Sequence, residues 1–281
     1  MSTNATTRGG ALKQRLAAGP CFGTFAKLGR PEVAEILALA GFDFLICDME
    51  HAPVTEIEAR AFIKAAVALD VSVVVRLPEP TPGLVNRLLE AGAVGIQMPR
   101  LRTSAEVGAL KAMMHYPPLG RRSYGAANML GGYGSVPQAE YVERANSRVL
   151  TIGQFETREV EEPIEGMLDG LDVAFIGPAD LSLDFGFGGR FDAPPVAERI
   201  KAVEAAVHKA GTGTVMGIAT RDAAATRPFV EAGYRFLAVG NDIGTFAASA
   251  RGVVSRLADL VAELREAGPA ATPSDASTPS N

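Results

Sequence analysis

Two carboxylates stand at the ends of two successive apolar runs that are typical of buried strands. Glu156 closes the run that begins at residue 149, and Asp180 follows the run 173–176 after a Gly-Pro pair that forces a sharp exit. Barrels and open α/β sheets carry their chemistry at the carboxyl ends of the strands. We therefore expect the two carboxylates to meet there and to share one divalent cation, because hard cations take oxygen ligands.

Further polar side chains follow other strand-like runs. Asp48 and His51 follow the run 42–47, Arg76 follows three valines, and Gln154 precedes Glu156 by two residues. An arginine there can neutralise a developing enolate oxygen, and a histidine oriented by an aspartate can move a proton. Together with a cation that polarises a carbonyl, this set fits aldol cleavage or addition at a 2-oxo acid.

Several of these residues also have a purely structural interpretation. Asp180 taken alone is typical of a helix cap, and Arg76 could simply pair with Glu50 or Asp48, since buried arginines are rare unless paired. Lys27 ends the first strand-like run and is the one lysine placed for a Schiff base. A solvated loop lysine is the simpler interpretation of that position.

The composition excludes several classes of protein. The 281 residues carry 27 basic and 32 acidic side chains, with no basic cluster that would favour nucleic-acid binding. No apolar run approaches ~18 residues, so we expect no membrane span and no signal peptide. Cys21 and Cys47 lie inside apolar runs, which is typical of reduced core cysteines in a cytoplasmic protein, with a disulfide as the alternative.

A repeat of helix, glycine and apolar strand runs through the chain, as at Ala40-Gly41, Ala91-Gly92 and Ala232-Gly233. Glycine just past a helix tolerates positive φ, and such units build a parallel sheet. The pattern predicts an α/β fold, a single-domain (β/α)8 TIM barrel. An open doubly wound sheet is the alternative, but no Gly-x-Gly-x-x-Gly follows the first strand. The eight expected strands are 20–27, 42–50, 72–78, 93–98, 149–156, 171–177, 214–220 and 235–240.

The barrel is expected to occupy residues 11–267. We expect a disordered N-terminus over 1–10 and a disordered tail over 268–281, where Pro, Ser, Thr and Ala dominate. A long insert at 116–147, rich in Gly, Pro and Tyr, separates the fourth helix from the fifth strand. Loops of that length in compact domains are typical of lids or partner contacts.

Five motifs occur in order along the chain: Asp48-Met49-Glu50-His51-Ala52-Pro53, Val75-Arg76-x-Pro78, Tyr116-Pro117-Pro118-x-Gly120-x-Arg122, Gln154-x-Glu156-Thr157 and Phe175-Ile176-Gly177-Pro178-Ala179-Asp180-Leu181-Ser182. Together, across residues 12 to 265, they resemble the metal-dependent (class II) pyruvate aldolases of the HpcH/HpaI family, which includes 4-hydroxy-2-oxoheptanedioate aldolase.

The resemblance implies a homo-oligomer, a trimer or a hexamer built as a dimer of trimers, with the C-terminal helix exchanged between neighbouring subunits. It implies Mg²⁺, Mn²⁺ or Co²⁺ as the cofactor and pyruvate and an aldehyde as the small-molecule partners. The site residues it implies are Glu156 and Asp180 for the metal, His51 with Asp48 for proton transfer, Arg76 for the enolate, Gln154 beside the metal, and Gly177, Pro178 and Ala179 for the pyruvyl carboxylate.

The chain departs from the family pattern at three places. Glu90 stands where many members have an aspartate that reaches a neighbouring subunit's site, so Glu90 is a candidate interface residue. The insert reads Ala-Ala-Asn-Met-Leu at 126–130, where a basic residue is common, which leaves the aldehyde open. Phe25 replaces a frequent tryptophan.

The resemblance predicts reversible cleavage of a 4-hydroxy-2-oxo acid to pyruvate and an aldehyde through a metal-stabilised enolate. The alternative on the same site is a related carbon–carbon lyase or decarboxylase, acting on oxaloacetate or on a malyl-CoA or citramalyl-CoA thioester. A thioester site should carry extra basic residues, and the insert offers Arg121 and Arg122. A Schiff-base aldolase using Lys27 and a barrel with a vestigial site are the remaining hypotheses.

Overall fold

The computed structural model describes residues 12–266, so the segments expected to be disordered, 1–10 and 268–281, lie outside the described residues. The chain divides into two units after Asp242. Within the described part, no helix is long and apolar enough to cross a membrane.

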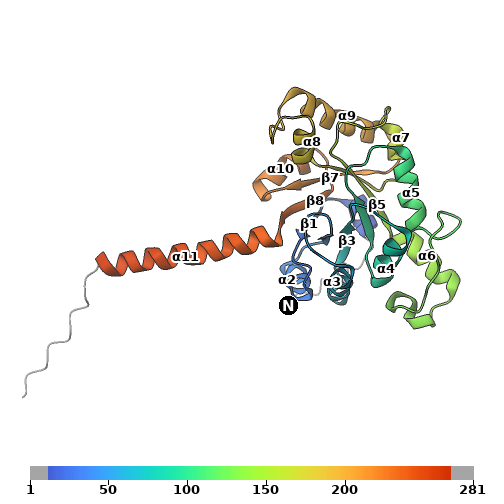
Figure 1. Ribbon diagram of the computed structural model, residues 1–281, viewed down its shortest axis with the longest axis horizontal. Helices are drawn as coiled ribbons and strands as arrows, with labels where there is room; N and C mark the ends of the chain where they lie inside the picture. The colour runs from blue at the N-terminus through green and yellow to red at the C-terminus, as the bar shows by residue number, and fades with distance from the viewer. Residues whose placement is uncertain (1–11, 267–281) are drawn as a thin grey trace, which may run out of the picture. The chain divides into compact units, whose positions relative to one another are not determined.

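Eight parallel strands close into a barrel in the first unit (Figure 1). Each strand pairs with the next along the chain, and β8 returns to pair with β1. Each expected range holds one strand, with β8 ending one residue past its range, so the predicted (β/α)8 barrel is confirmed. The strands are β1 (Cys21–Ala26), β2 (Phe44–Asp48), β3 (Ser72–Arg76), β4 (Gly95–Met98), β5 (Leu150–Phe155), β6 (Val173–Ile176), β7 (Val215–Thr220) and β8 (Phe236–Asn241).

The apolar side chains of the strands form two layers because successive residues of a strand point to opposite faces. Phe44, Ile46 and Val74 belong to the cluster that fills the barrel, whereas Leu45 and Val73 belong to the cluster that packs beneath the helices. Helix α1 (Leu12–Ala18) adds two buried leucines to the inner cluster. Its seven residues carry too short a pattern for the sequence to have predicted it.

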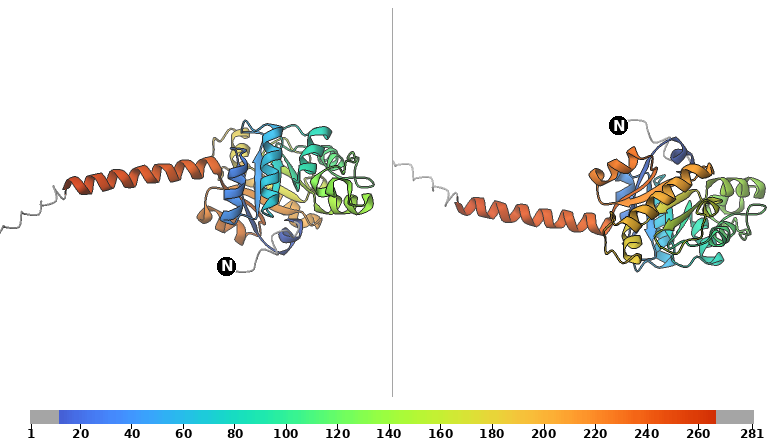
Figure 2. Two further views of the ribbon diagram at one scale, coloured as in Figure 1. Left: turned by 90° about the horizontal axis from the view of Figure 1, so that it is seen from below. Right: turned by 90° about the horizontal axis from the view of Figure 1, so that it is seen from above.

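Helices connect the strands on the outside of the barrel (Figures 1 and 2). Thr55 and Thr103 each begin a helix with a capping box, and Gly41 ends another in the left-handed conformation. The helices are α2 (Pro31–Ala40), α3 (Glu56–Ala68), α4 (Pro82–Ala91), α5 (Ser104–Met114), α7 (Glu165–Leu168), α8 (Pro178–Asp184), α9 (Pro194–Ala210) and α10 (Ala223–Glu231).

The insert between α5 and β5 is more regular than the sequence suggested. It contains the short 3₁₀ helix η1 (Met129–Gly134) and the helix α6 (Gln138–Arg148). In α6 only Tyr141 is buried, and the segment is mostly polar, so it offers few apolar residues from which a helix could be predicted. The role of the insert as a lid or partner contact stays a prediction.

Helix α11 (Asp242–Glu266) forms the described part of the second unit from Ile243 onward. Its apolar side chains, including Phe246, Val254 and Leu264, are exposed in the described chain. Its exchange between neighbouring subunits stays a prediction.

Candidate active site

A buried ion pair joins the carboxyl ends of β2 and β3. Asp48 and Arg76 are the last residues of these strands and stand opposite each other in the register. Arg76 donates from Nε to Oδ1 of Asp48 at 3.0 Å and from Nη2 to Oδ2 at 2.7 Å. Both side chains are almost fully buried. A bidentate contact of this kind fixes the orientation of the guanidinium group as well as the position of its charge.

Asp48 also organises the turn that follows β2. Its Oδ1 accepts the main-chain N–H groups of Glu50 and His51 at 3.1 and 3.2 Å. Burial raises the pKa of Asp48, but the hydrogen bonds and charge of Arg76 outweigh burial and hold the pKa below its ordinary value. Lys27 places its Nζ 3.5 Å from Oδ2 of the same carboxylate. Asp48 is therefore an ionised carboxylate that contacts two cationic side chains and stabilises the turn after β2.

Arg76 has two further neighbours. Its guanidinium carbon lies 4.7 Å from the centre of the Phe25 ring, and its Nη1 lies 3.3 Å from Oε2 of Glu50. The guanidinium group therefore has three neighbours, Asp48, Glu50 and Phe25. The arginine is thus held in one position before any substrate arrives, which is what stabilisation of a developing negative charge requires.

His51 lies at the edge of this cluster with its side chain about half exposed. Its Nε2 is 3.6 Å from Oε2 of Glu50. The hydrogen bond between His51 and Asp48 comes from the main chain of His51. The predicted pairing of the imidazole with Asp48 stays a prediction.

Glu156 follows β5 and holds its carboxylate in a buried, hydrogen-bonded position. Oε2 accepts from Nε2 of Gln154 at 2.7 Å, and Oε1 accepts the main-chain N–H of Arg100 at 2.8 Å. Burial, together with the charges of Asp180 and Glu50, raises the pKa of Glu156 to about 7, although the N–H of Arg100 and the charge of Arg76 lower it. A buried carboxyl surrounded by other carboxylates is typical of a group that gains a cation.

Helix α8 brings Asp180 beside Glu156. Asp180 lies in the first turn of α8, and its negative charge acts on Glu156. At the far end of the helix, Asp184 accepts from the N–H of Arg158 at 2.8 Å and from the hydroxyl of Thr157 at 3.1 Å. These bonds tie α8 to the loop that follows Glu156. The charge of Asp180 therefore reaches Glu156, and their sharing of one metal ion stays a prediction.

The residues at the carboxyl ends of the strands, which we call the rim, fit a divalent ion with oxygen ligands. A Cβ added to Gly177 would lie 2.5 Å from Oε2 of Glu156, so the glycine leaves the space that the carboxylate occupies. Among residues 12–266, no group of three or more His, Cys, Asp or Glu side chains forms a metal-binding cluster. Mg²⁺ commonly uses one or two carboxylates and fills its other positions with water and substrate oxygens. Glu156 and Asp180 supply that number.

Two further residues near the site were given no role in the sequence analysis. Gln97 is fully buried, stands opposite Arg76 in the register, and leaves both its Oε1 and Nε2 without a hydrogen-bond partner in the described structure. Arg100 adopts a φ of 51°, which is uncommon for a residue with a side chain, and so aims its N–H at Glu156. The polar end of strand 4 signalled Gln97, whereas nothing in the sequence signalled the conformation of Arg100.

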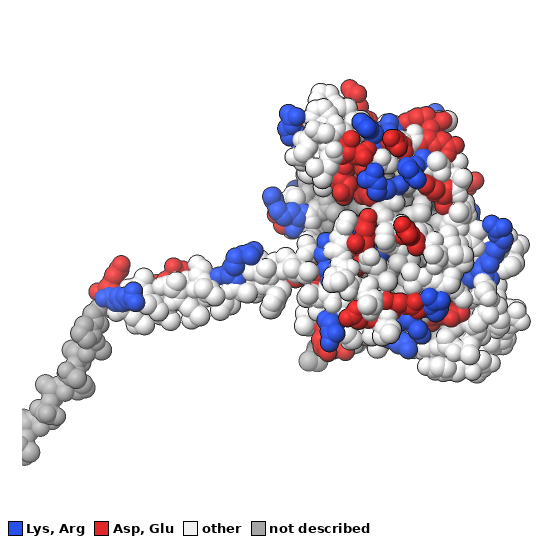
Figure 3. All heavy atoms as spheres, in the orientation of Figure 1, with Lys and Arg blue, Asp and Glu red and all other residues white. Residues whose placement is uncertain are grey.

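Glu90 lies apart from the rim described above. It belongs to the last turn of α4, where a Cβ on Gly125 of the insert would lie 2.8 Å from its Oε1. Its assignment to a neighbouring subunit's site stays a prediction. In the view of Figure 3, Asp and Glu side chains lie over the middle of the barrel with Lys and Arg interspersed around them.

The fold and this rim define a (β/α)8 barrel with a candidate acid–base and metal site at the carboxyl ends of its strands. A family model described as HpcH/HpaI aldolase/citrate lyase matches residues 22–249. A hydroxypyruvate/pyruvate aldolase of Agrobacterium fabrum is 36% identical over 252 residues, covering 87% of this chain and 92% of that protein. A 4-hydroxy-2-oxo-heptane-1,7-dioate aldolase of Salmonella dublin is 34% identical, covering 88% and 94%.

The structural comparison agrees with the sequence comparison. The crystal structure of an HpcH/HpaI aldolase from Desulfitobacterium hafniense is similar with a TM-score of 0.81 and 32% identity, covering 88% of this chain and 96% of that one. The chain belongs to the HpcH/HpaI aldolase/citrate lyase family. The resemblance found in the five motifs is therefore confirmed.

Proposed function

We propose that the protein is a divalent-metal-dependent aldolase that reversibly cleaves a 4-hydroxy-2-oxo acid into an aldehyde and pyruvate or a hydroxylated pyruvate. The observation that carries this proposal is that Glu156, Asp180 and Arg76 stand at the carboxyl ends of β5, β6 and β3 and that the charges of Asp180 and Arg76 both act on Glu156. The names of the relatives, a hydroxypyruvate/pyruvate aldolase among them, support the choice of donor.

Glu156 and Asp180 would hold the ion, for which we propose Mg²⁺, Mn²⁺ or Co²⁺. When bound there, the ion supplies Lewis-acid polarisation of the 2-oxo group. Gln154 and the N–H of Arg100 hold the Glu156 carboxylate in place, as partners behind a metal ligand commonly do.

Arg76 would bind the oxygen on which negative charge develops as the carbon–carbon bond breaks. Its position is set by Asp48 and Phe25, so no reorganisation is needed at that moment. The carboxylate of the donor would accept the N–H of Ala179 in the first turn of α8. Pro178 at the start of that helix has no N–H to offer.

His51 would take the proton from the 4-hydroxyl group in cleavage and return it in the reverse reaction. Its half-exposed position and the nearby carboxylate of Glu50 suit a group that must meet both substrate and solvent. Asp48 fixes the main chain of His51, which sets where the imidazole can reach. We also propose that the enzyme works in the cytoplasm as a homo-oligomer.

Exchange of the methyl protons of pyruvate in heavy water tests this proposal without knowledge of the aldehyde. We expect exchange with Mn²⁺, and loss of exchange with excess chelator or in the Glu156→Gln variant. The Glu198→Gln variant, altered at an exposed position in α9, is the matched control and should exchange like the wild type. Exchange that persists in chelator, or absence of exchange with Mn²⁺ both at the methyl group of pyruvate and at the C3 methylene of hydroxypyruvate, would overturn the proposal.

A further inference from the structure

Arg122 is a buried cation that lies in the insert, away from the strand ends. Its side chain is almost fully buried, its Nε donates to Oδ1 of Asn86 at 2.8 Å, and its guanidinium group stacks on Tyr116 with 4.6 Å between carbon and ring centre. Within residues 12–266, no Asp or Glu oxygen forms an ion pair with it. Glu90 acts on it only at longer range. Buried charges in proteins are ordinarily paired, so this cation lacks its expected partner.

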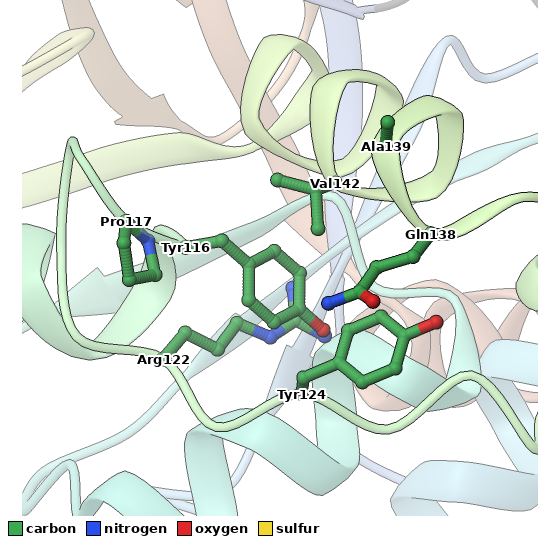
Figure 4. Close-up of a pocket in the computed structure, with 7 residues that line it drawn as sticks. All are labelled: Tyr116, Pro117, Arg122, Tyr124, Gln138, Ala139 and Val142. Atoms are coloured by element: carbon green, nitrogen blue, oxygen red, sulfur yellow. The ribbon is translucent and has the colours of Figure 1, made fainter.

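An open cavity of about 650 Å³ lies beside this guanidinium group (Figure 4). Its walls are mainly apolar and come from two segments of the insert, residues 116–124 and α6, not from the strand ends that build the candidate active site. Figure 4 shows the side chains of Tyr116, Tyr124, Arg122 and Gln138 converging on one region from these two segments. The lining residues are Tyr116, Pro117, Arg122, Tyr124, Gln138, Ala139 and Val142.

The walls of this cavity, which we name the insert cavity, are held together by contacts of their own. The rings of Tyr116, Tyr124 and Tyr141 lie within 6.2 Å of one another, centre to centre. Asn128 donates to the hydroxyl of Tyr141 at 3.1 Å and to the carbonyl of Gly125 at 2.7 Å. The aromatic wall is therefore built before a ligand enters, as binding sites for small molecules commonly are.

The chemistry of the lining defines the class of ligand. A guanidinium group matches a carboxylate in charge and in its flat, two-pronged geometry. Tyrosine rings and proline favour a flat apolar body, and the amide of Gln138 offers one further polar contact. The volume lies within the range of small-molecule sites, roughly 300–1,000 Å³.

We propose that the insert cavity binds a small carboxylate with a flat apolar body, such as an aromatic carboxylate, and that Arg122 is its counter-ion. The site is separate from the candidate active site. The ligand would supply the negative charge that the chain itself does not place beside Arg122.

Calorimetric titration of the metal-free protein with benzoate tests the proposal, and two partial probes separate the contributions. Acetate carries the charge without the ring, and benzyl alcohol carries the ring without the charge. We expect benzoate to bind at least tenfold more tightly than either. Equal affinity for acetate and benzoate, or no binding of benzoate at millimolar concentration, would overturn the proposal.

Two variants locate the binding. Arg122→Met keeps the length of the side chain and removes its charge. Val142→Phe fills the insert cavity and leaves residue 122 as arginine. We expect each to weaken benzoate at least tenfold, whereas Arg102→Met, altered at an exposed arginine of another loop, should bind like the wild type. Wild-type affinity in folded Val142→Phe would place benzoate elsewhere and refute the assignment. Because metal, donor and turnover are absent from the assay, this result does not depend on the proposed aldolase activity.

Discussion

A Cβ atom on Gly177 would lie 2.5 Å from Oε2 of Glu156 and 2.8 Å from its Cβ. Contacts of that length essentially do not occur, so the carboxylate occupies its place only because residue 177 has no side chain. The φ of Gly177 is −107°, which any residue can adopt. The glycine is therefore required by the close approach of Glu156 and not by its backbone conformation.

Gly177→Ala should displace the Glu156 carboxylate and weaken Mn²⁺ binding by about tenfold or more, the size of effect seen when partners behind a metal ligand are lost. Titration calorimetry measures the affinity. Gly108→Ala in α5 is the control, because an added Cβ there meets nothing within 4 Å. Unchanged Mn²⁺ affinity in the Gly177 variant would show that Glu156 is not a ligand or that the contact relaxes freely.

Arg76→Lys should lower kcat/KM by about 100- to 1,000-fold, because lysine keeps the charge but loses the two-pronged contact that positions it. Steady-state kinetics with a 4-hydroxy-2-oxo acid measures the loss. Arg87 offers a control of the same chemistry, since it contacts both carboxylate oxygens of Glu56 at 2.6 and 2.7 Å on the exposed outer surface. Arg87→Lys should leave kcat/KM within about twofold of the wild type. Equal losses in both variants would remove the special role of Arg76.

The raised pKa of Glu156 predicts a pH-dependent stability for the metal-free protein. Burial raises this pKa from 4.5 to about 7. Between these values the folded state holds a proton that the unfolded state has lost, so stability falls as pH rises from 4.5 to 7. The whole effect is on the order of 3 kcal/mol.

Glu156→Gln should remove this component, so its stability relative to the wild type should increase between pH 5 and pH 7.5. Urea unfolding in the presence of chelator measures the difference, with Glu198→Gln as the exposed control. A constant difference across that range would mean that Glu156 titrates at its ordinary pKa.

Lys27 should not form a Schiff base with pyruvate. Its Nζ lies 3.5 Å from Oδ2 of the buried Asp48, and its main-chain N–H is held by Asp242 at 2.9 Å. The ammonium group in this ion pair has no lone pair with which to attack the carbonyl carbon of pyruvate. Borohydride reduction in the presence of pyruvate, followed by mass spectrometry, should reveal no adduct. An adduct that disappears in Lys27→Met would establish the lysine-dependent mechanism instead.

The barrel was predictable because each strand is a short apolar run closed by turn residues, and because a glycine follows helices such as α2 and α4. These signals are local in the chain. Helix α6 was not predicted because its sequence is mostly polar and only one of its side chains, Tyr141, is buried. The positive φ of Arg100 was not predicted either, because it accompanies a contact with Glu156, which lies far away in the sequence.

The sequence by itself determined the strands, their order and the residues that follow them, because apolar periodicity and turn residues depend on positions that are neighbours in the chain. It also determined which family the chain belongs to. Only the tertiary structure decided which of those residues meet: that Arg76 contacts both Asp48 oxygens, that Gly177 makes room for Glu156, and that Arg122 is buried beside a cavity without a carboxylate. Such contacts join positions far apart in the chain, and packing alone brings them together.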